Sequence, residues 1–238
     1  LIAYVTAGDP DMSMTGKLIC EMADNGVDIV EVGIPFSDPT AEGEVIYNAN
    51  MRALANNTTV DDVFSSIKTA REHSDVAIVL LTYINPVFVY GYEKFFGKCK
   101  EIGVDGIIIP DMPFEEINEI KDYANKSDVS IITLISPTSN NRIEKIVRNA
   151  KGFIYLVSSL GVTGVRENIN HDLQKIIEEI RLYTNTPIAV GFGISGPSQA
   201  AEISKICDGV IVGSAIVKII EENKNKSIIP VVNFVKEL

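Results

Sequence analysis

The sequence predicts a single-domain (β/α)8 barrel, or TIM barrel, on three observations. Apolar runs with the length of buried strands alternate about eight times with segments of helical periodicity. The runs are continuously apolar, as strands of a parallel sheet covered on both faces must be. The 238 residues fit one such barrel better than an open doubly wound sheet, and no linker or shift in composition divides the chain. We therefore expect one domain spanning residues 1–238.

Each expected strand is an apolar run bounded by turn-forming residues. The first ends before Gly8-Asp9-Pro10, the third at Asn85-Pro86, and the seventh at a glycine turn that begins at Gly191. In order, the strands cover residues 1–5, 29–34, 76–83, 106–110, 129–135, 153–157, 187–190 and 209–212.

Between these runs, apolar residues spaced three and four apart predict helices. Gly26 and Gly103 end two of them, and Thr59 followed by Asp62 starts another. The helices cover residues 14–25, 45–54, 59–73, 92–102, 115–124, 140–149, 173–180, 198–206, 215–222 and 228–236.

Composition narrows the choice of partners. The net charge is -11 and no basic patch stands out, so we expect neither nucleic acid nor a membrane surface as a partner. No apolar run reaches membrane-spanning length. The three cysteines lack metal-ligand spacing, which predicts buried free thiols, no metal site and a cytoplasmic location.

Glu31 is the most informative side chain in the sequence. It sits in an apolar strand, on the face opposite Val30 and Val32. If those valines pack against helices, Glu31 points into the barrel, where loss of hydration raises its pKa and suits it to proton transfer. The alternative is a structural ion pair, and both remain open at this point.

Other polar side chains fall at the ends of expected strands, where a barrel places its active site. Asp111, after the fourth strand, is either a further site candidate or an ordinary turn carboxylate, and we favour the second reading. The remaining candidates at these ends are Tyr4, Thr6, Tyr83 and Tyr155.

Two glycine turns follow the last two strands, Gly191-Phe192-Gly193 and Gly213-Ser214. Barrels commonly bind phosphate there, because glycine permits close backbone approach and a helix N-terminus offers free N–H groups. We expect Ser214 to cap the following helix and Gly164 to complete the cradle. Glycine turns are also ordinary connectors, so phosphate is the favoured of two readings.

Several motifs, in the same order along the chain, resemble the alpha subunit of tryptophan synthase. They are Thr6-Ala7-Gly8-Asp9-Pro10, Glu31-Val32-Gly33-Ile34-Pro35-Phe36-Ser37-Asp38-Pro39, Gly161-Val162-Thr163-Gly164, Gly191-Phe192-Gly193-Ile194-Ser195 and Gly213-Ser214-Ala215-Ile216-Val217-Lys218. The resemblance implies a TIM barrel that cleaves indole-3-glycerol phosphate to indole and glyceraldehyde 3-phosphate in tryptophan biosynthesis. It implies no cofactor in this chain, and a beta subunit that carries pyridoxal phosphate as partner in an alpha2beta2 tetramer.

The resemblance also assigns roles to residues. It makes Glu31 and Glu42 the catalytic acids, and it implies that a short N-terminal helix of the family is absent here. The phosphate positions are Gly164, Phe192, Gly193, Gly213 and Ser214, and the indole pocket is Tyr4, Leu81, Tyr83, Ile108, Leu134 and Tyr155. Asp38 and Thr163 belong to the partner and lid loops.

Two departures from the family pattern leave alternatives open. Glu42 is one methylene longer than the usual aspartate, and Glu44 stands where proline is common. One alternative is a weakly active or inactive barrel that binds and activates a beta subunit. The other is a different phosphate-binding barrel enzyme of indole or anthranilate metabolism.

Overall fold

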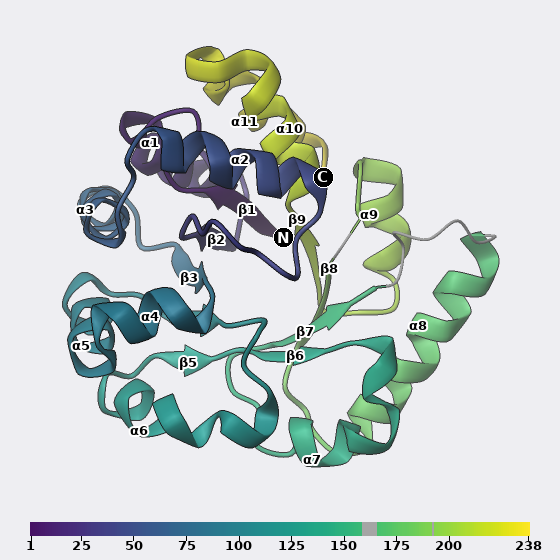
Figure 1. The fold of residues 1–238 in the computed structure, drawn as a ribbon. Helices are drawn as coiled ribbons and strands as arrows, with labels where there is room; N and C mark the ends of the chain where they lie inside the picture. The colour runs from purple at the N-terminus through teal and green to yellow at the C-terminus, as the bar shows by residue number, and fades with distance from the viewer. Residues whose placement is uncertain (159–165, 192) are drawn as a thin grey trace.

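Parallel strands form one sheet that curls into a nearly closed barrel, with helices around its outside (Figure 1). The computed structural model describes residues 1–158, 166–191 and 193–238, and within these ranges it has nine strands and eleven α-helices. The strand order is β5-β4-β3-β2-β1-β9-β8-β7-β6. Because β5 and β6 are separated by Ile132 alone, they act as one divided strand and complete an eight-stranded barrel. The predicted (β/α)8 fold is confirmed.

The strands lie close to their predicted positions. They are β1 (Ile2–Thr6), β2 (Ile29–Gly33), β3 (Ala77–Leu81), β4 (Gly106–Ile108), β5 (Ser130–Ile131), β6 (Thr133–Ile135), β7 (Ile154–Val157), β8 (Ile188–Gly191) and β9 (Gly209–Val212). β4 pairs with β5 and β7 pairs with β6, so the predicted fifth strand changes neighbour at Ile132.

The helices form the outer layer. They are α1 (Met12–Asp24), α2 (Glu44–Ala55), α3 (Val60–Arg71), α4 (Ile84–Tyr90), α5 (Tyr92–Ile102), α6 (Asn118–Lys126), α7 (Ile143–Val147), α8 (Arg166–Arg181), α9 (Pro197–Ile203), α10 (Ser214–Asn223) and α11 (Ile228–Glu237). The described part also has the 3-10 helices η1 (Phe114–Glu116), η2 (Pro137–Arg142) and η3 (Lys224–Lys226). In this part of the chain, no helix is long and apolar enough to cross a bilayer.

Two predicted elements differ from the structure. The prediction that Asn85-Pro86 only ends a strand missed α4, whose first turn contains this pair; proline is tolerated there because the first turn lacks intrahelical N–H partners. The expected helix over 140–149 shortens to α7, because η2 takes up its first residues. Asp111 accepts a hydrogen bond from the Ile84 N–H at 3.0 Å, so it is a structural carboxylate at the start of α4.

Two apolar layers surround the strands, and they determine where Glu31 points. Val30 and Val32 belong to the large core between the strands and the helices. A smaller cluster inside the barrel contains Ile2, Val79 and Ile211. Because successive strand residues point to opposite faces, Glu31 lies on the inner face with this smaller cluster, as the alternation predicted.

Helix α2 is tied to elements far from it in the sequence. Arg52 donates to both carboxylate oxygens of Asp9 at 2.9 and 2.8 Å, and Asp9 is buried in the loop after β1. Arg52 also donates to Glu221 of α10 at 2.7 Å. A bidentate arginine–carboxylate pair specifies orientation as well as distance, so α2 is held in a defined position beside the open end of the barrel.

The cysteines are free thiols, as predicted. Cys99 is buried, but Cys20 and Cys207 are only partly buried, so the expectation of three buried thiols is wrong for these two.

Candidate active site

One pocket at the C-terminal ends of the strands brings together most of the predicted site residues. Its volume is about 180 Å³. It is lined by Tyr4, Glu31, Ala41, Glu42, Gly43, Ile46, Leu81, Tyr155, Gly193, Ile194, Ile211, Gly213 and Ser214. These residues come from β1, β2, β3, β7 and β9, from the loops that follow β2, β8 and β9, and from the first turns of α2 and α10. Closure of the barrel therefore brings two carboxylates and two glycine turns together around one small pocket.

Glu31 lies on the barrel floor of this pocket. Its side chain is 1% exposed, and among the described residues its Oε2 atom has no hydrogen-bond partner. Burial, reinforced by the nearby Glu42 carboxylate, raises the pKa of Glu31 to about 8. Glu31 is thus protonated at neutral pH and holds a proton next to an open space.

Glu42 approaches the same pocket from the loop after β2, and it is half-buried. The Asn50 amide donates to Glu42 Oε2 at 2.5 Å, and the Tyr83 hydroxyl donates to the same carboxylate. Burial raises the pKa of Glu42 to about 7, while these two hydrogen bonds favour the ionised form and limit the rise. The two acids therefore differ: the described residues supply donors to Glu42 and none to Glu31 Oε2.

Tyr83 connects the Glu42 loop to the start of α4. Its hydroxyl accepts a hydrogen bond from the Ala41 N–H at 3.1 Å, and its ring centroid lies 5.2 Å from that of Phe36. Burial raises the pKa of Tyr83 to about 12, so the phenol keeps its proton and remains a donor to Glu42.

Two more tyrosines form walls beside Glu31, and each lies over a glycine. A Cβ atom on Gly33 would lie 2.2 Å from the Tyr4 hydroxyl, and one on Gly191 would lie 2.6 Å from the Tyr155 hydroxyl. Both distances are impossible for a side chain, so these glycines make room for the rings. Burial raises the pKa of Tyr4 and of Tyr155. The phenols are therefore neutral walls rather than bases.

The opposite end of the pocket is made of backbone. Gly193 has a φ of +83°, a conformation that glycine adopts without strain. Gly213 precedes the first residue of α10, so the free N–H groups and positive end of a ten-residue helix face this end. Ser214 is the first helical residue and makes no capping hydrogen bond, so the prediction that it caps α10 is wrong. None of the described residues lining the pocket is lysine or arginine.

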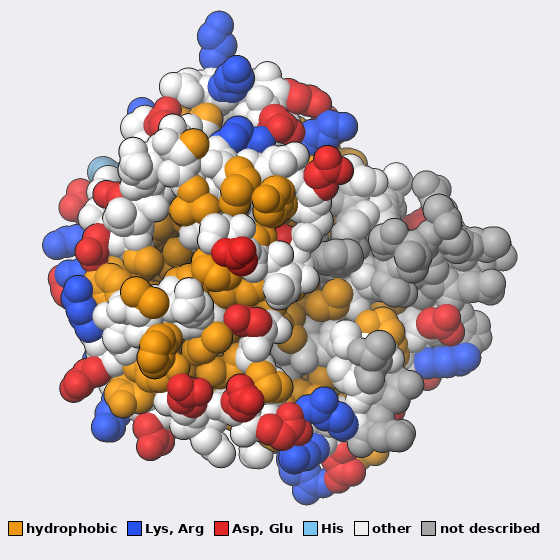
Figure 2. Space-filling model, in the orientation of Figure 1, with side chains coloured by type: hydrophobic (Ala, Val, Ile, Leu, Met, Phe, Trp, Pro, Cys, Tyr) orange, Lys and Arg blue, Asp and Glu red, His pale blue; other side chains and the backbone are white. Residues whose placement is uncertain are grey.

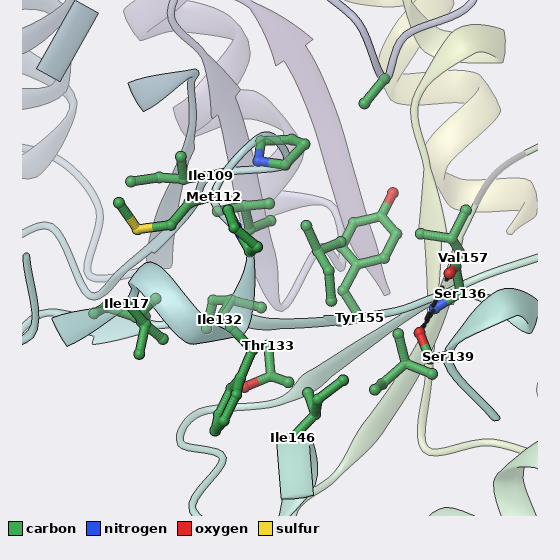
Figure 3. Close-up of a pocket in the computed structure, with 18 of the residues that line it drawn as sticks. Ile109, Met112, Ile117, Ile132, Thr133, Ser136, Ser139, Ile146, Tyr155 and Val157 are labelled. Atoms are coloured by element: carbon green, nitrogen blue, oxygen red, sulfur yellow. Dashed lines mark hydrogen bonds between the residues drawn. The ribbon is translucent and has the colours of Figure 1, made fainter. Parts of the chain in front are cut away.

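A larger apolar cavity of about 410 Å³ adjoins the pocket and shares Ala41, Leu81 and Tyr155 with it. Ile108 and Leu134, two of the predicted indole-pocket residues, line this cavity. Figure 3 shows Tyr155 projecting into it, with Ile132, Ile146 and other aliphatic side chains around the space. Its lining suits a flat apolar ring better than a charged group.

Some of the predicted site residues do not line the pocket, and others lie outside the described residues. Tyr83 touches the site through Glu42, and Asp38 is exposed in the same loop, where it accepts a hydrogen bond from Ser37. Thr163, Gly164 and Phe192 lie outside the described residues. Within the described ranges, no three or more His, Cys, Asp or Glu side chains are grouped to hold a metal ion.

Sequence reasoning missed Asn50, which is 1% exposed and bonded to Glu42. A signal was present, because Asn50 lies beside Ala49 and three residues before Ala53 on the buried face of its helix. A polar amide at such a position requires a partner, which the sequence alone does not name.

Comparison with known proteins gives a consistent result along the whole chain. The family model described as "Tryptophan synthase alpha chain" matches residues 1–237. A curated relative of that name from Lacticaseibacillus casei is 46% identical over 237 residues, covering 100% of this chain and 89% of its own length. Another from Caldanaerobacter subterraneus is 46% identical over 226 residues, covering 95% of this chain and 86% of its own.

Solved structures agree. Tryptophan synthase subunit alpha from Campylobacter jejuni superimposes with a TM-score of 0.90 at 36% identity, over 99% of this chain and 94% of that one. A chain from the Pyrococcus furiosus tryptophan synthase a2b2 complex gives a TM-score of 0.92 at 36% identity, over 100% and 96%.

Proposed function

Because the chain belongs to the tryptophan synthase alpha chain family, we propose that this barrel is the lyase that cleaves indole-3-glycerol phosphate to indole and glyceraldehyde 3-phosphate in tryptophan biosynthesis. The observation that carries the proposal at residue level is the pair of unlike carboxyl groups in one pocket. Glu31 is buried with no partner at Oε2 in the part of the chain that the structure describes, and Glu42 is held by donors. A retro-aldol cleavage needs both kinds of acid at once.

The chemistry explains why. Indole C3 must gain a proton, which places positive charge on the ring nitrogen. The bond from C3 to the glycerol chain then breaks, its electrons restore the aromatic ring, and the adjacent hydroxyl loses its proton to become the aldehyde. In our proposal Glu31 supplies the proton to C3 and afterwards accepts the hydroxyl proton, so it ends the cycle protonated. Its pKa near 8 keeps it protonated at the start.

Glu42 has the complementary role. Ionised, it accepts the indole N–H hydrogen bond and stabilises the positive charge that develops on the ring in the transition state. The extra methylene of Glu42 does not leave it without support, because its carboxylate lies 2.5 Å from the Asn50 amide nitrogen. This contact favours an active enzyme over the barrel that only activates a partner.

The substrate's phosphate is assigned to the N-terminus of α10 with Gly193, Gly213 and Ser214. Support comes from the free N–H groups there and from the glycine conformation at Gly193. Phe192 and Gly164 remain predictions for the same cradle. The indole ring would extend past Leu81 and Tyr155 toward Ile108 and Leu134, along the apolar lining. Anchoring the phosphate at one end sets the ring between the two acids.

The partner is a tryptophan synthase beta subunit, as in the a2b2 complex from Pyrococcus furiosus. We assign the contact face to α4 and the loop carrying Asp38, because Phe88 and Val89 are 64% and 75% exposed. Figure 2 shows hydrophobic side chains gathered on this side of the molecule. Pyridoxal phosphate belongs to the partner in this proposal, and this chain uses none. The free cysteines suit a cytoplasmic location.

The test is an assay of the purified chain on indole-3-glycerol phosphate, with and without a beta subunit, measuring indole and glyceraldehyde 3-phosphate. Equal amounts of the two products from the chain alone support the proposal. Activity only in the partner's reaction, with no cleavage under any condition, would support the partner-activating alternative instead. Turnover of a different phosphorylated indole or anthranilate compound, and not of this substrate, would support the third reading.

A further inference from the structure

The side chain of Asn50 reaches the loop that carries Glu42, although Asn50 itself belongs to helix α2 of the outer layer. It lies on the buried face of α2, and its amide donates to Glu42 Oε2 at 2.5 Å. A buried amide without a partner is unfavourable, and a buried carboxylate without a donor is more so. Each of these two groups therefore satisfies the other.

The two partners differ in how firmly they are held. Helix α2 is fixed by the pairs that Arg52 makes with Asp9 and Glu221. Glu42 stands in a loop next to Gly43, which is exposed and makes no side-chain cap for α2. Asn50 is therefore the more firmly held of the two residues, and its amide determines where the Glu42 carboxylate lies.

We propose that Asn50 is a positioning residue of the cleavage reaction: it receives the Glu42 carboxylate from the loop, aims it into the pocket and keeps it in the ionised form. The proposal rests on the function proposed above. Tyr83 donates to the same carboxylate, but the Ala41 N–H bonded to its hydroxyl comes from the Glu42 loop itself. Asn50 ties the carboxylate to α2, which Arg52 anchors to Asp9 and Glu221, two points outside that loop.

The contact with Asn50 also affects which of the two acids is ionised: it favours an ionised Glu42 beside a protonated Glu31. Among the described residues, the groups that face Glu42 are Glu31 from β2, Tyr4 from β1, Tyr83 after β3 and Asn50 from α2. None of these four is a cation, so within the described part of the chain the donors Asn50 and Tyr83 are what oppose the effect of burial on the Glu42 carboxylate. Removing the Asn50 donor should move the proton balance toward a protonated Glu42, which cannot accept the indole N–H.

The first experiment compares Asn50→Ala with Asn48→Ala, an exposed asparagine on the same helix. Loss of a hydrogen bond to a charged group predicts a fall in kcat of ~10- to 100-fold for Asn50→Ala, with KM changed only a few-fold because the phosphate cradle is untouched. The acid limb of the kcat/KM profile should move to higher pH. Asn48→Ala should behave as the parent. An unchanged kcat and pH profile in Asn50→Ala overturns the proposal.

A methylene swap distinguishes positioning from general support of the fold. Glu42→Asp shortens one partner and Asn50→Gln lengthens the other, so the double variant restores the combined reach. We expect each single variant to lose kcat and the double variant to recover at least ten-fold over Glu42→Asp. Additive losses would show that the two side chains do not act through one contact.

Two further measurements keep the result interpretable. In a Glu42→Gln background, Asn50→Ala should cause no additional loss of kcat; a full further loss would mean that Asn50 acts by another route. Carbon-13 titration of the Glu42 carboxyl in the parent and in Asn50→Ala reads the ionisation without turnover. If the parent fails to cleave the substrate, the proposed function fails, but the titration still shows whether Asn50 holds the Glu42 carboxylate ionised. If the Glu42 carboxyl titrates alike in the parent and in Asn50→Ala, the inference about Asn50 is overturned while the proposed function stands. Binding of glycerol phosphate verifies that each variant is folded.

Discussion

Replacing Glu42 by aspartate tests how closely the active site is fitted to the longer acid. In the parent, the Asn50 amide nitrogen lies 2.5 Å from Glu42 Oε2. Removing one methylene withdraws the carboxylate by about 1.5 Å if the loop backbone stays in place, which opens this contact to about 4 Å. A separation of that size no longer supports a hydrogen bond. The contact to the indole N–H should lengthen by a similar amount.

The magnitude follows from the lost contacts. A hydrogen bond to a charged group is worth about 1.5–3 kcal/mol, which corresponds to a ~10- to 150-fold change in rate. A displacement near 1 Å at a reacting group independently predicts a loss of ~10²-fold. We therefore expect Glu42→Asp to lower kcat by one to two orders of magnitude. KM should change less, because the phosphate end of the pocket does not involve this side chain.

The assay is steady-state cleavage of indole-3-glycerol phosphate, followed by indole release, for the chain alone and with saturating beta subunit. Glycerol phosphate binding serves as the control for an intact pocket. A rate for Glu42→Asp equal to or above the parent rate would refute the reasoning. It would mean that the loop places the shorter acid as well or better, and that the extra methylene is a handicap.

Four other predictions address the remaining parts of the site. Glu31→Gln should lower kcat by ~10²- to 10⁴-fold with the fold intact, measured by turnover and circular dichroism; activity within a few-fold of the parent would make Glu31 structural. The kcat/KM profile should be bell-shaped with apparent limbs near pH 7 and 8, since acid protonates Glu42 and base deprotonates Glu31; a flat profile between pH 6 and 9 contradicts this assignment. Gly213→Val should raise KM several-fold by obstructing the N-terminus of α10, and unchanged glycerol phosphate binding would locate the phosphate elsewhere. A saturating beta subunit should raise kcat more than ten-fold by closing the loop after β2, and an equal kcat with and without it would exclude such closure.

Much of the fold was predictable because its signals are local. Buried parallel strands read as apolar runs whatever their neighbours are, and helices read from spacing within a few residues. The period of two along β2 likewise puts Glu31 opposite Val30 and Val32 on the evidence of the sequence alone, and the structure agrees. The roles assigned to Thr163, Gly164 and Phe192 remain predictions from sequence.

The tertiary structure decided what depends on closure of the barrel. The start of α4 at Ile84 uses a hydrogen bond to Asp111, which comes from the next strand's loop, so no local reading of Asn85-Pro86 reveals it. Ser214 became the first residue of α10 instead of its cap.

The same distinction separates Glu31 from Asn50. Glu31 faces the pocket because of its place in a strand, which the sequence by itself determines. Asn50 reaches the Glu42 loop because Arg52 ties α2 both to Asp9 after β1 and to Glu221 on α10, near the two ends of the chain. Such contacts form only when distant segments meet, since a side chain's periodicity states which face it occupies but not what that face will touch.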